Sequence, residues 1–397
     1  MLSAAVHRYR EVLAIPATRD VTVVGTLVRL PIFAAGLALT FHAVLTLHVS
    51  WFQAGLLTTA TTLAGAMSSP VRGRMLDTRG LRRTLLPCVA VGAVCWSVAP
   101  FVGYWALLVL AVLAGLFQVP VFSIVRQGIV ATTPRELRQT ALALDAVLVE
   151  LAFMVGPVVG TWLATTRSTR WTVLGLQWSC LLAVVALMVW NPPLVDEEAT
   201  GQGHVPRRQW FTPRFVVILL ASSAATMTLS GTDVAIVAML RSWGQTPATG
   251  WVMASWGLGS LVGGLVYGGL QRTVPVLRML GALALVTIPA AWATGVLSLA
   301  VLVTAAGLLC APTITASSHG LAEGVPGQAL GEAMGWHGSA MTLGSALGAP
   351  LAGLVMDRTG PGAGFLTVGL LSLAVAVLGS LAVRGRRARS ASGRAAA

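Results

Sequence analysis

Long apolar runs separated by short polar segments make up most of the chain. A membrane-spanning helix needs about 20 mostly apolar residues. Twelve such runs can be placed, at about 21–48, 53–76, 84–101, 104–127, 139–162, 171–191, 215–240, 249–270, 279–295, 297–318, 331–355 and 365–383. The runs are too long and too uniformly apolar for barrel strands, and backbone groups in lipid must pair internally. The sequence therefore predicts an all-α polytopic membrane protein with twelve transmembrane helices.

The two halves of this pattern repeat each other. The residues Ala114-Gly115-Leu116, Pro120 and Gly128 return 192 positions later as Ala306-Gly307-Leu308, Pro312 and Gly320. At an offset of 193, Gly156-Pro157-Val158-Val159-Gly160 is matched by Ala349-Pro350-Leu351-Ala352-Gly353. Six helices in each half give a parallel repeat, and related halves that rock about a central site are a common basis of alternating access. The repeat therefore favours a transporter.

Five segments follow from this pattern. They are a cytoplasmic N-terminal segment (1–20), an N-terminal six-helix half (21–191), a cytoplasmic linker (192–213), a C-terminal six-helix half (214–384) and a basic cytoplasmic tail (385–397). The linker is the one long polar interruption and is rich in Pro, Gly and acidic residues. It is expected to be a flexible connector, with His204 a solvated loop residue rather than a ligand.

Composition and charge support a membrane location. Hydrophobic residues make up 56% of the chain and charged residues 10%, against about a quarter in soluble domains. The net charge of +13 would suggest nucleic-acid binding in a soluble protein, but 21 of the 26 basic residues fall on one side of a topology with both termini inside. That asymmetry follows the positive-inside rule. We therefore expect a multi-pass plasma-membrane protein with cytoplasmic termini and no nucleic-acid partner.

The loop between the second and third runs carries a motif. It reads Gly73-Arg74-Met75-Leu76-Asp77-Thr78-Arg79-Gly80-Leu81-Arg82-Arg83 and resembles the signature G-x-L-x-D-R-x-G-R-R of the major facilitator superfamily. The match keeps Gly73, Asp77, Gly80, Arg82 and Arg83, and replaces two basic positions with Thr78 and Leu81. The resemblance implies the fold of that family, with two six-helix halves, and a gating role for this loop.

The motif residues suit such a gate. Gly80 can take the positive φ of a short turn. Asp77 can face helix N-termini or Arg and so fix the cytoplasmic ends of neighbouring helices. Arg126, near the same end of the fourth helix, is also expected to take part in gating. The alternative is that the loop arginines serve only to fix the topology.

A second resemblance lies on helix five. Gly156-Pro157-x-x-Gly160 is similar to the G-P-x-x-G pattern of exporters in the same superfamily. Pro157 removes a helical hydrogen bond and is expected to bend the helix, as is Pro350 in the second half. Gly156 and Gly160 allow a close neighbour, for which the glycine-rich face of helix eight is the expected partner. The alternative is tight packing with no bearing on transport direction.

One exporter pattern is absent. Proton-coupled drug exporters of the superfamily often carry R-x-x-x-G on helix four, and Ala111 stands four residues before Gly115 here.

Ionisable groups within the apolar runs are candidates for function, because they are costly at bilayer depth. Glu150, near the middle of helix five, is the first candidate for proton coupling. Asp145 lies about 140° around the same helix and is a further candidate, with a structural ion pair to Arg126 as the favoured alternative. Asp233 on helix seven is a candidate for proton coupling or substrate contact, or for an ion pair at the outer rim.

Two polar residues of helix one complete the set. His42 is a candidate for the substrate cavity, with a hydrogen-bonded structural role as the favoured alternative. Arg29 lies near the inner boundary and is expected to snorkel towards it. No metal site, cofactor site or catalytic set is recognised.

Taken together, these features predict a secondary active transporter rather than an enzyme. The expected activity is proton-coupled efflux of a small amphipathic compound by a monomer, with lipid, substrate and protons as partners and no cofactor. The alternatives are an importer or facilitator of a polar metabolite, or a polytopic membrane enzyme or sensor.

Overall fold

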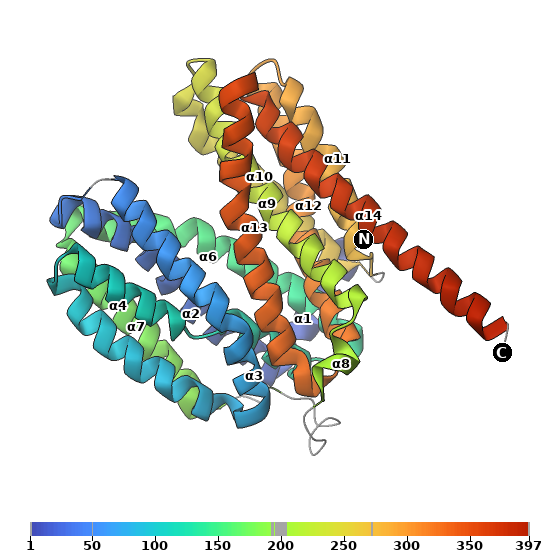
Figure 1. Cartoon of the computed structure of the whole chain (residues 1–397), viewed down its shortest axis with the longest axis horizontal. Coiled ribbons are helices and arrows are strands. Elements are labelled where there is room, and N and C mark those ends of the chain that lie inside the picture. The colour runs from blue at the N-terminus through green and yellow to red at the C-terminus, as the bar shows by residue number, and fades with distance from the viewer. Residues whose placement is uncertain (1, 50, 192–193, 195–204, 271–272, 396–397) are drawn as a thin grey trace. The chain divides into compact units, whose positions relative to one another are not determined.

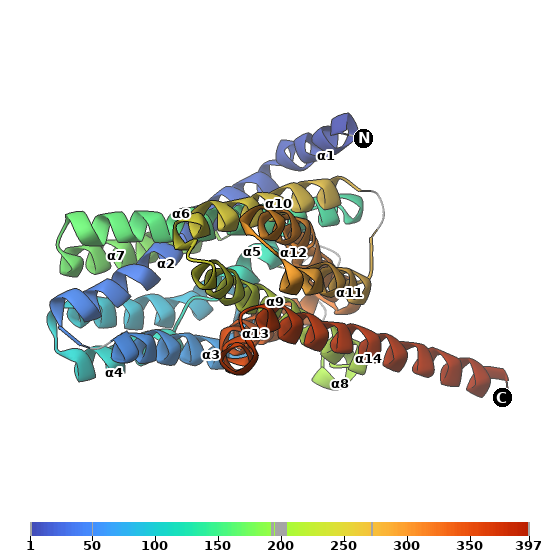
Figure 2. The same ribbon diagram turned by 90° about the horizontal axis from the view of Figure 1, so that it is seen from above.

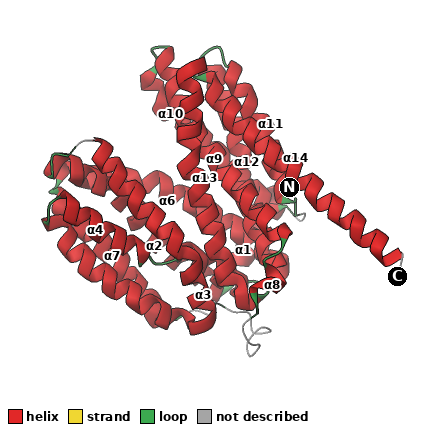
Figure 3. Cartoon of the chain, in the orientation of Figure 1, coloured by secondary structure: helices red, strands yellow, loops and turns green. Residues whose placement is uncertain are grey.

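Helices form the regular structure of the described part of the chain, which comprises residues 2–49, 51–191, 194, 205–270 and 273–395 of a computed structural model (Figure 3). Ten helical segments in this part are long and apolar enough to cross a membrane. One of them, Gln53–Phe101, contains two helices, and the shorter apolar helix Val276–Trp292 occupies the ninth predicted run. The twelve predicted helices are therefore all found, which confirms the all-α polytopic fold.

The chain forms two compact units. The first contains Ser3–Val205 together with Val325–Ser339, and the second contains Pro206–Gly324 together with Ala340–Ala397. The main helices of the first unit are α1 (Leu2–Ala14), α2 (Pro16–Phe41), α3 (Trp51–Val98), α4 (Tyr104–Leu116), α5 (Val121–Thr132), α6 (Arg138–Thr166) and α7 (Thr169–Trp190). The main helices of the second are α8 (Arg207–Trp210), α9 (Pro213–Ser242), α10 (Thr249–Gly269), α11 (Val276–Thr287), α12 (Val296–Gly324) and α14 (Gly362–Ala395). The remaining helix, α13 (Leu330–Thr359), contributes residues 330–339 to the first unit and its other residues to the second.

Short helices complete these elements. They are η1 (His42–Thr46), which prolongs α2, η2 (Ala99–Phe101), η3 (Arg135–Leu137), η5 (Thr246–Ala248), η6 (Ile288–Trp292) and η7 (Gly327–Ala329).

Gly80 divides α3 into the second and third membrane helices. Its φ of 76° and ψ of 175° interrupt the helical backbone, and Gly80 is one of three described glycines with positive φ. A side chain is strongly disfavoured at such a φ, whereas glycine adopts it readily. The predicted role of Gly80 in a short turn is confirmed.

Within the first unit, α2 packs against α6 and α7, and α3 packs against α4 (Figures 1 and 2). Two apolar clusters fill the space between these helices. One is centred on Val28, Leu85 and Ile129, and the other includes Leu107 and Ala111. Ala111, at the position where the exporter pattern would have Arg, is fully buried in apolar surroundings.

The sequence repeat corresponds to a repeated helix pair. In the first unit, a Cβ at Gly115 on α4 would lie 2.5 Å from the Thr61 carbonyl oxygen of α3. At the equivalent position in the second unit, Gly307 on α12 approaches the Trp256 carbonyl oxygen of α10 even more closely. Small residues at membrane-helix interfaces allow such backbone contacts. The repeated glycines therefore hold the same helix pair together in each unit.

The glycines of helix five meet a different neighbour from the one predicted. A Cβ at Gly156 would lie 2.6 Å from Cβ of Phe33, and Gly160 is in contact with the carbonyl of Ala34, so both pack on α2. The glycine-rich face of helix eight packs within the second unit, where Gly259 contacts α12. The expected partner was wrong, because helices one and five already form a close pair inside the first unit.

Both prolines of the predicted bends lie within continuous helices. α6 runs through residue 157, but the side chain of Pro157 is outside the described part of the chain. Pro350 lies inside α13. The bends themselves stay predictions.

The predicted polar segments are described in part. Residues 192–193 and 195–204 of the linker, including His204, lie outside the described residues, and α8 falls in the remainder. The predicted N-terminal segment contains α1 and the start of α2. The predicted basic tail is a continuation of α14, which ends at Ala395 (Figure 1).

Candidate functional site

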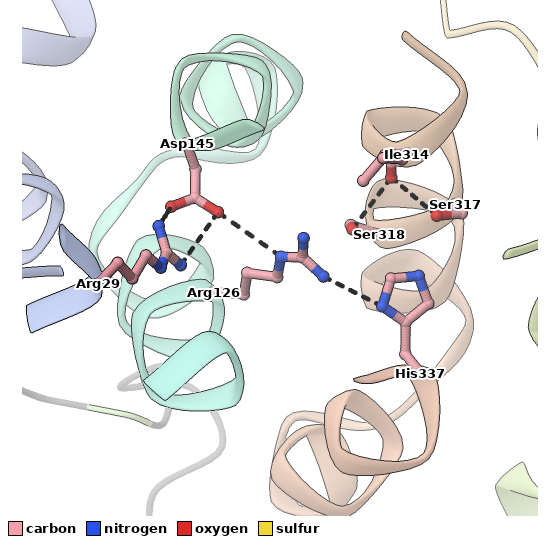
Figure 4. A network of polar contacts seen from close by, with 7 residues as sticks. All are labelled: Arg29, Arg126, Asp145, Ile314, Ser317, Ser318 and His337. Carbon is pink, nitrogen blue, oxygen red and sulfur yellow. Dashed lines mark hydrogen bonds and ion pairs between the residues drawn. The ribbon is translucent and has the colours of Figure 1, made fainter. Parts of the chain in front are cut away.

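Three buried charges meet inside the first unit. Asp145 on α6 accepts a 2.5 Å hydrogen bond from Nη1 of Arg29 on α2, and its other oxygen lies 3.6 Å from Nε of Arg126 on α5. The exposed fractions are 1% for Arg29, 4% for Arg126 and 1% for Asp145. Figure 4 shows Asp145 placed between the two guanidinium groups. The predicted Arg126–Asp145 ion pair is therefore present.

Arg29 does not snorkel as expected. Its side chain is directed into the unit, where the Asp145 carboxylate lies within reach on the neighbouring helix. A buried guanidinium is stabilised by such a bidentate partner, and this contact replaces hydration at the boundary. The expectation was wrong because it considered only the position of Arg29 along its own helix.

His337 is a further member of this cluster. It lies on the part of α13 that belongs to the first unit, it is fully buried, and its Nδ1 is 3.1 Å from Nη1 of Arg126. Because a guanidinium only donates, Nδ1 of His337 is the acceptor and carries no proton. We refer to Arg29, Arg126, Asp145 and His337 as the charge cluster.

Aromatic rings border the charge cluster. The Arg29 guanidinium lies 4.8 Å from the centroid of the Phe122 ring, and that of Arg126 lies 6.0 Å from the same centroid. Phe33 packs edge-on against both Phe122 and Phe153, at centroid distances of 6.4 and 5.5 Å. Cation–π contact stabilises charge on the face of a ring, so Phe122 joins the charged and aromatic parts of the site.

Asp77 binds the beginning of α13. Its Oδ1 accepts hydrogen bonds from the backbone N–H of Gly331 at 2.8 Å and from Nε2 of Gln127 at 2.9 Å, and its Oδ2 accepts one from the backbone N–H of Glu332 at 2.7 Å. The first amides of a helix have no partner within the helix, and the dipole there favours a carboxylate. The expectation that Asp77 faces a helix N-terminus is confirmed.

Close backbone packing supports this contact. Gly73 on α3 touches the carbonyl of Gly331, and a Cβ at Gly331 would lie 2.5 Å from Oδ1 of Asp77. Further along α13, Ser339 donates a 2.6 Å hydrogen bond to the carbonyl of Ala66. Side chains at Gly73 or Gly331 would push α13 away from α3. This close packing explains why the motif glycine is needed at position 73.

Arg82 of the loop motif binds a different helix end. Its Nε and Nη2 donate hydrogen bonds of 3.0 and 3.1 Å to the carbonyl oxygens of Met188 and Val189, in the last turn of α7. Basic side chains satisfy the unpaired carbonyls at helix C-termini. Arg83 is exposed. Of the two motif arginines, Arg82 therefore fixes the end of a neighbouring helix.

The other candidates lie outside the charge cluster. Glu150 on α6 and Asp233 on α9 are each partly buried. His42 is fully buried and its Nδ1 lies 3.0 Å from the hydroxyl of Thr169, as its favoured structural role requires. Among the described residues, no group of three or more His, Cys, Asp or Glu is placed to hold a metal ion.

Two polar partners were missed by the sequence interpretation. His337 interrupts an apolar run, as His42 does, so the same criterion would have selected it. Gln127 directly follows Arg126 but carries no charge, and its partner Asp77 is 50 positions away in the chain. Only the folded arrangement identifies Gln127.

Membrane-length helices, a repeated helix pair and buried charges define a polytopic membrane protein built for transport. The model of the Major Facilitator Superfamily matches residues 21–236 and again residues 216–396, and the chain belongs to this family. The protein is thus a transporter and not an enzyme, and it acts on a small molecule within a membrane.

Solved structures share this fold. The human organic anion transporter MFSD10 (TETRAN) is 18% identical with a TM-score of 0.69, over 92% of this chain and 100% of that one. The proton:xylose symporter XylE is 12% identical with a TM-score of 0.70, over 91% and 94%. The E. coli fucose:proton symporter FucP is 14% identical with a TM-score of 0.66, over 91% and 98%. No curated protein sequence matches the chain.

Proposed function

We propose that the protein is a proton-driven exporter of a small amphipathic compound. It works by alternating access as a monomer in the plasma membrane, with both termini cytoplasmic and without a cofactor. The observation that carries this proposal is the charge cluster, in which Arg29, Arg126 and Asp145 are almost fully buried within membrane-length helices. Ionisable groups in such positions are costly, and they are kept where they serve binding, coupling or gating.

The contact of Asp77 with α13 supports a gate. Three hydrogen bonds join one carboxylate on α3 to α13 and α5, and two of them hold the first amides of α13. Charge-assisted bonds to helix amides stabilise a docked helix end, and a modest change in geometry breaks them. In the proposed cycle, the motif residues and Arg126 hold α13 in one state and release it in the other.

Glu150 is the proposed proton-coupling residue. It is partly exposed on α6, whereas Asp145 on the same helix is enclosed by two guanidinium groups. Proton exchange during alternating access requires a carboxyl group that water reaches. Asp145 and Asp233 are the second and third candidates.

The test replaces Glu150 with Gln. A compound screen in an efflux-deficient host, with and without a collapsed proton gradient, supplies a substrate for purified protein in vesicles. Glu150→Gln is expected to abolish substrate-driven proton movement, because an amide cannot carry the proton, while the thermal unfolding temperature stays the same. Glu136→Gln, at an exposed position of η3, is the matched control. Undiminished proton movement in Glu150→Gln would reject the role.

Import of a polar metabolite is the alternative. The sugar symporters that share the fold favour it, because their names describe sugar movement coupled to protons. Vesicles of known orientation separate the two directions. Proton-driven accumulation in inside-out vesicles supports export, and accumulation in right-side-out vesicles supports import.

A further inference from the structure

The charge cluster contains more positive than negative charge. Two guanidinium groups face one carboxylate, and His337 contributes a neutral imidazole whose Nδ1 accepts a hydrogen bond from Arg126. Buried charges are stable when they are balanced, so one more anion would neutralise the cluster.

The guanidinium groups also retain unused donors. Nε of Arg29 is buried and has no hydrogen-bond partner. The contacts of Arg126 involve its Nε and Nη1, and among the described residues none involves Nη2. Arginine presents its donors in a planar fork that fits a carboxylate. Each of the two guanidinium groups therefore keeps one donor that is available to a further anion.

An apolar surface continues from these donors. Phe33 lies four residues from Arg29 on α2, and Phe122 lies four residues from Arg126 on α5, so each ring is on the same helix face as its guanidinium. Phe153 on α6 packs against Phe33 and is 56% exposed. Phe33, Phe122 and Phe153 thus form an aromatic surface, the phenylalanine cluster, that starts at the charges and ends at an accessible ring.

We propose that the charge cluster and the phenylalanine cluster together bind an amphipathic organic monoanion. The anionic group, a carboxylate, binds Arg126 and Arg29, where it balances the excess charge. The apolar body packs on the three phenylalanine rings. This substrate class rests on the proposed function, since it assigns the cargo of that transporter.

Three probes with the same phenyl group and a different polar end test the proposal. They are 4-phenylbutyrate, 4-phenylbutylamine and 4-phenylbutanol, and their binding to the purified full-length protein is measured by calorimetry near neutral pH without any gradient. We expect the anion to bind at least about 10-fold more tightly than the amine, because one charge-assisted contact has this magnitude. Equal binding of the three probes, or tightest binding of the amine, would overturn the proposal.

Variants locate the site. Arg126→Gln is expected to lower the affinity for 4-phenylbutyrate about 10-fold or more and to leave the affinity for 4-phenylbutanol nearly unchanged. Arg167→Gln removes an equal charge at an exposed position outside the cluster and should bind the anion as the natural protein does. An Arg126→Gln protein that unfolds normally but keeps the full preference for the anion would refute the assignment.

Two milder variants test the same site if Arg126→Gln does not fold. Arg126→Lys keeps the charge, so it should retain the preference for the anion with lower affinity. Phe153→Ala alters an exposed ring and should weaken all three probes by a similar factor. A protein in which Phe153→Ala leaves all three affinities unchanged would contradict the proposed apolar surface.

The binding and transport measurements also distinguish failure of the proposed substrate class from failure of the proposed proton coupling. Binding at equilibrium involves no gradient, so selective anion binding without any proton movement would support the site and refute the coupling. Proton-driven transport of amines or neutral compounds alone would refute the substrate class and leave the coupling intact.

Discussion

Replacing Asp77 with Asn should release the beginning of α13. The carboxylate accepts hydrogen bonds from the amides of Gly331 and Glu332 and from Gln127. Asn keeps one acceptor oxygen and places an NH₂ group where the other oxygen was, so one amide bond is lost and the charge at the helix N-terminus disappears. Hydrogen bonds to charged groups contribute about 1.5–3 kcal/mol and the dipole about 0.3–1 kcal/mol. The docked state is therefore expected to lose about 2–4 kcal/mol, or about 30- to 900-fold in population.

Hydrogen exchange measured by mass spectrometry reads this loss directly. The amides of Gly331 and Glu332 lie in the first turn of α13 and have the Asp77 carboxylate as their acceptor. Their exchange should accelerate in Asp77→Asn, up to the factor estimated above. Asp357→Asn removes an exposed carboxylate near the other end of the same helix and serves as the control. Unchanged exchange of these two amides in Asp77→Asn would show that the contact does not hold α13.

Transport measurements on the same variant distinguish gating from folding. If Asp77 stabilises one state of the cycle, Asp77→Asn should slow transport while equilibrium binding of substrate changes little. An equal loss of binding and transport would instead indicate a general folding defect and would contradict the gating role.

Two further predictions concern stability, and both are checked by thermal unfolding in detergent. Asp145→Asn leaves two buried guanidinium groups without their carboxylate and should destabilise the protein by about 3–5 kcal/mol; adding Arg126→Gln should recover part of this loss, and additive losses would refute the coupling. Gly160→Ala places a Cβ against the backbone of Ala34 and should cost about 1–3 kcal/mol. Gly175→Ala, where no atom lies within 4 Å, should be neutral or stabilising, and an equal effect at both glycines would contradict the packing argument.

Local patterns predicted the helices of this protein well. Each apolar run satisfies its own backbone hydrogen bonds, so its length alone indicates a membrane helix, and the φ of Gly80 followed from the short turn that the motif requires. The Arg126–Asp145 pair was predictable because few charges occur within the apolar runs, which limits the choice of partners.

Contacts between distant segments were not predictable in this way. His337 binds Arg126 across 211 positions of sequence, and Asp77 binds amides more than 250 positions away. Arg29 was misassigned for the same reason, since the carboxylate that holds it lies on another helix. Such contacts depend on how helices pack, and hydrophobic periodicity does not specify which polar faces meet.

These distant contacts join residues of the first sequence half to residues of the second. The sequence alone suggests that the coupling and gating charges are concentrated in the first half, since Gly338 stands at the position equivalent to Asp145. The structure places residues 330–339 with the first unit, where His337 contacts Arg126 and the amides of Gly331 and Glu332 contact Asp77. The groups of the second half that hydrogen-bond these charges are neutral, namely an imidazole and two backbone amides. A neutral partner can bind a charge and release it at lower cost than an opposite charge can, because no buried ion pair has to be separated. The proposed gate, in which the beginning of α13 docks and undocks during transport, requires this difference.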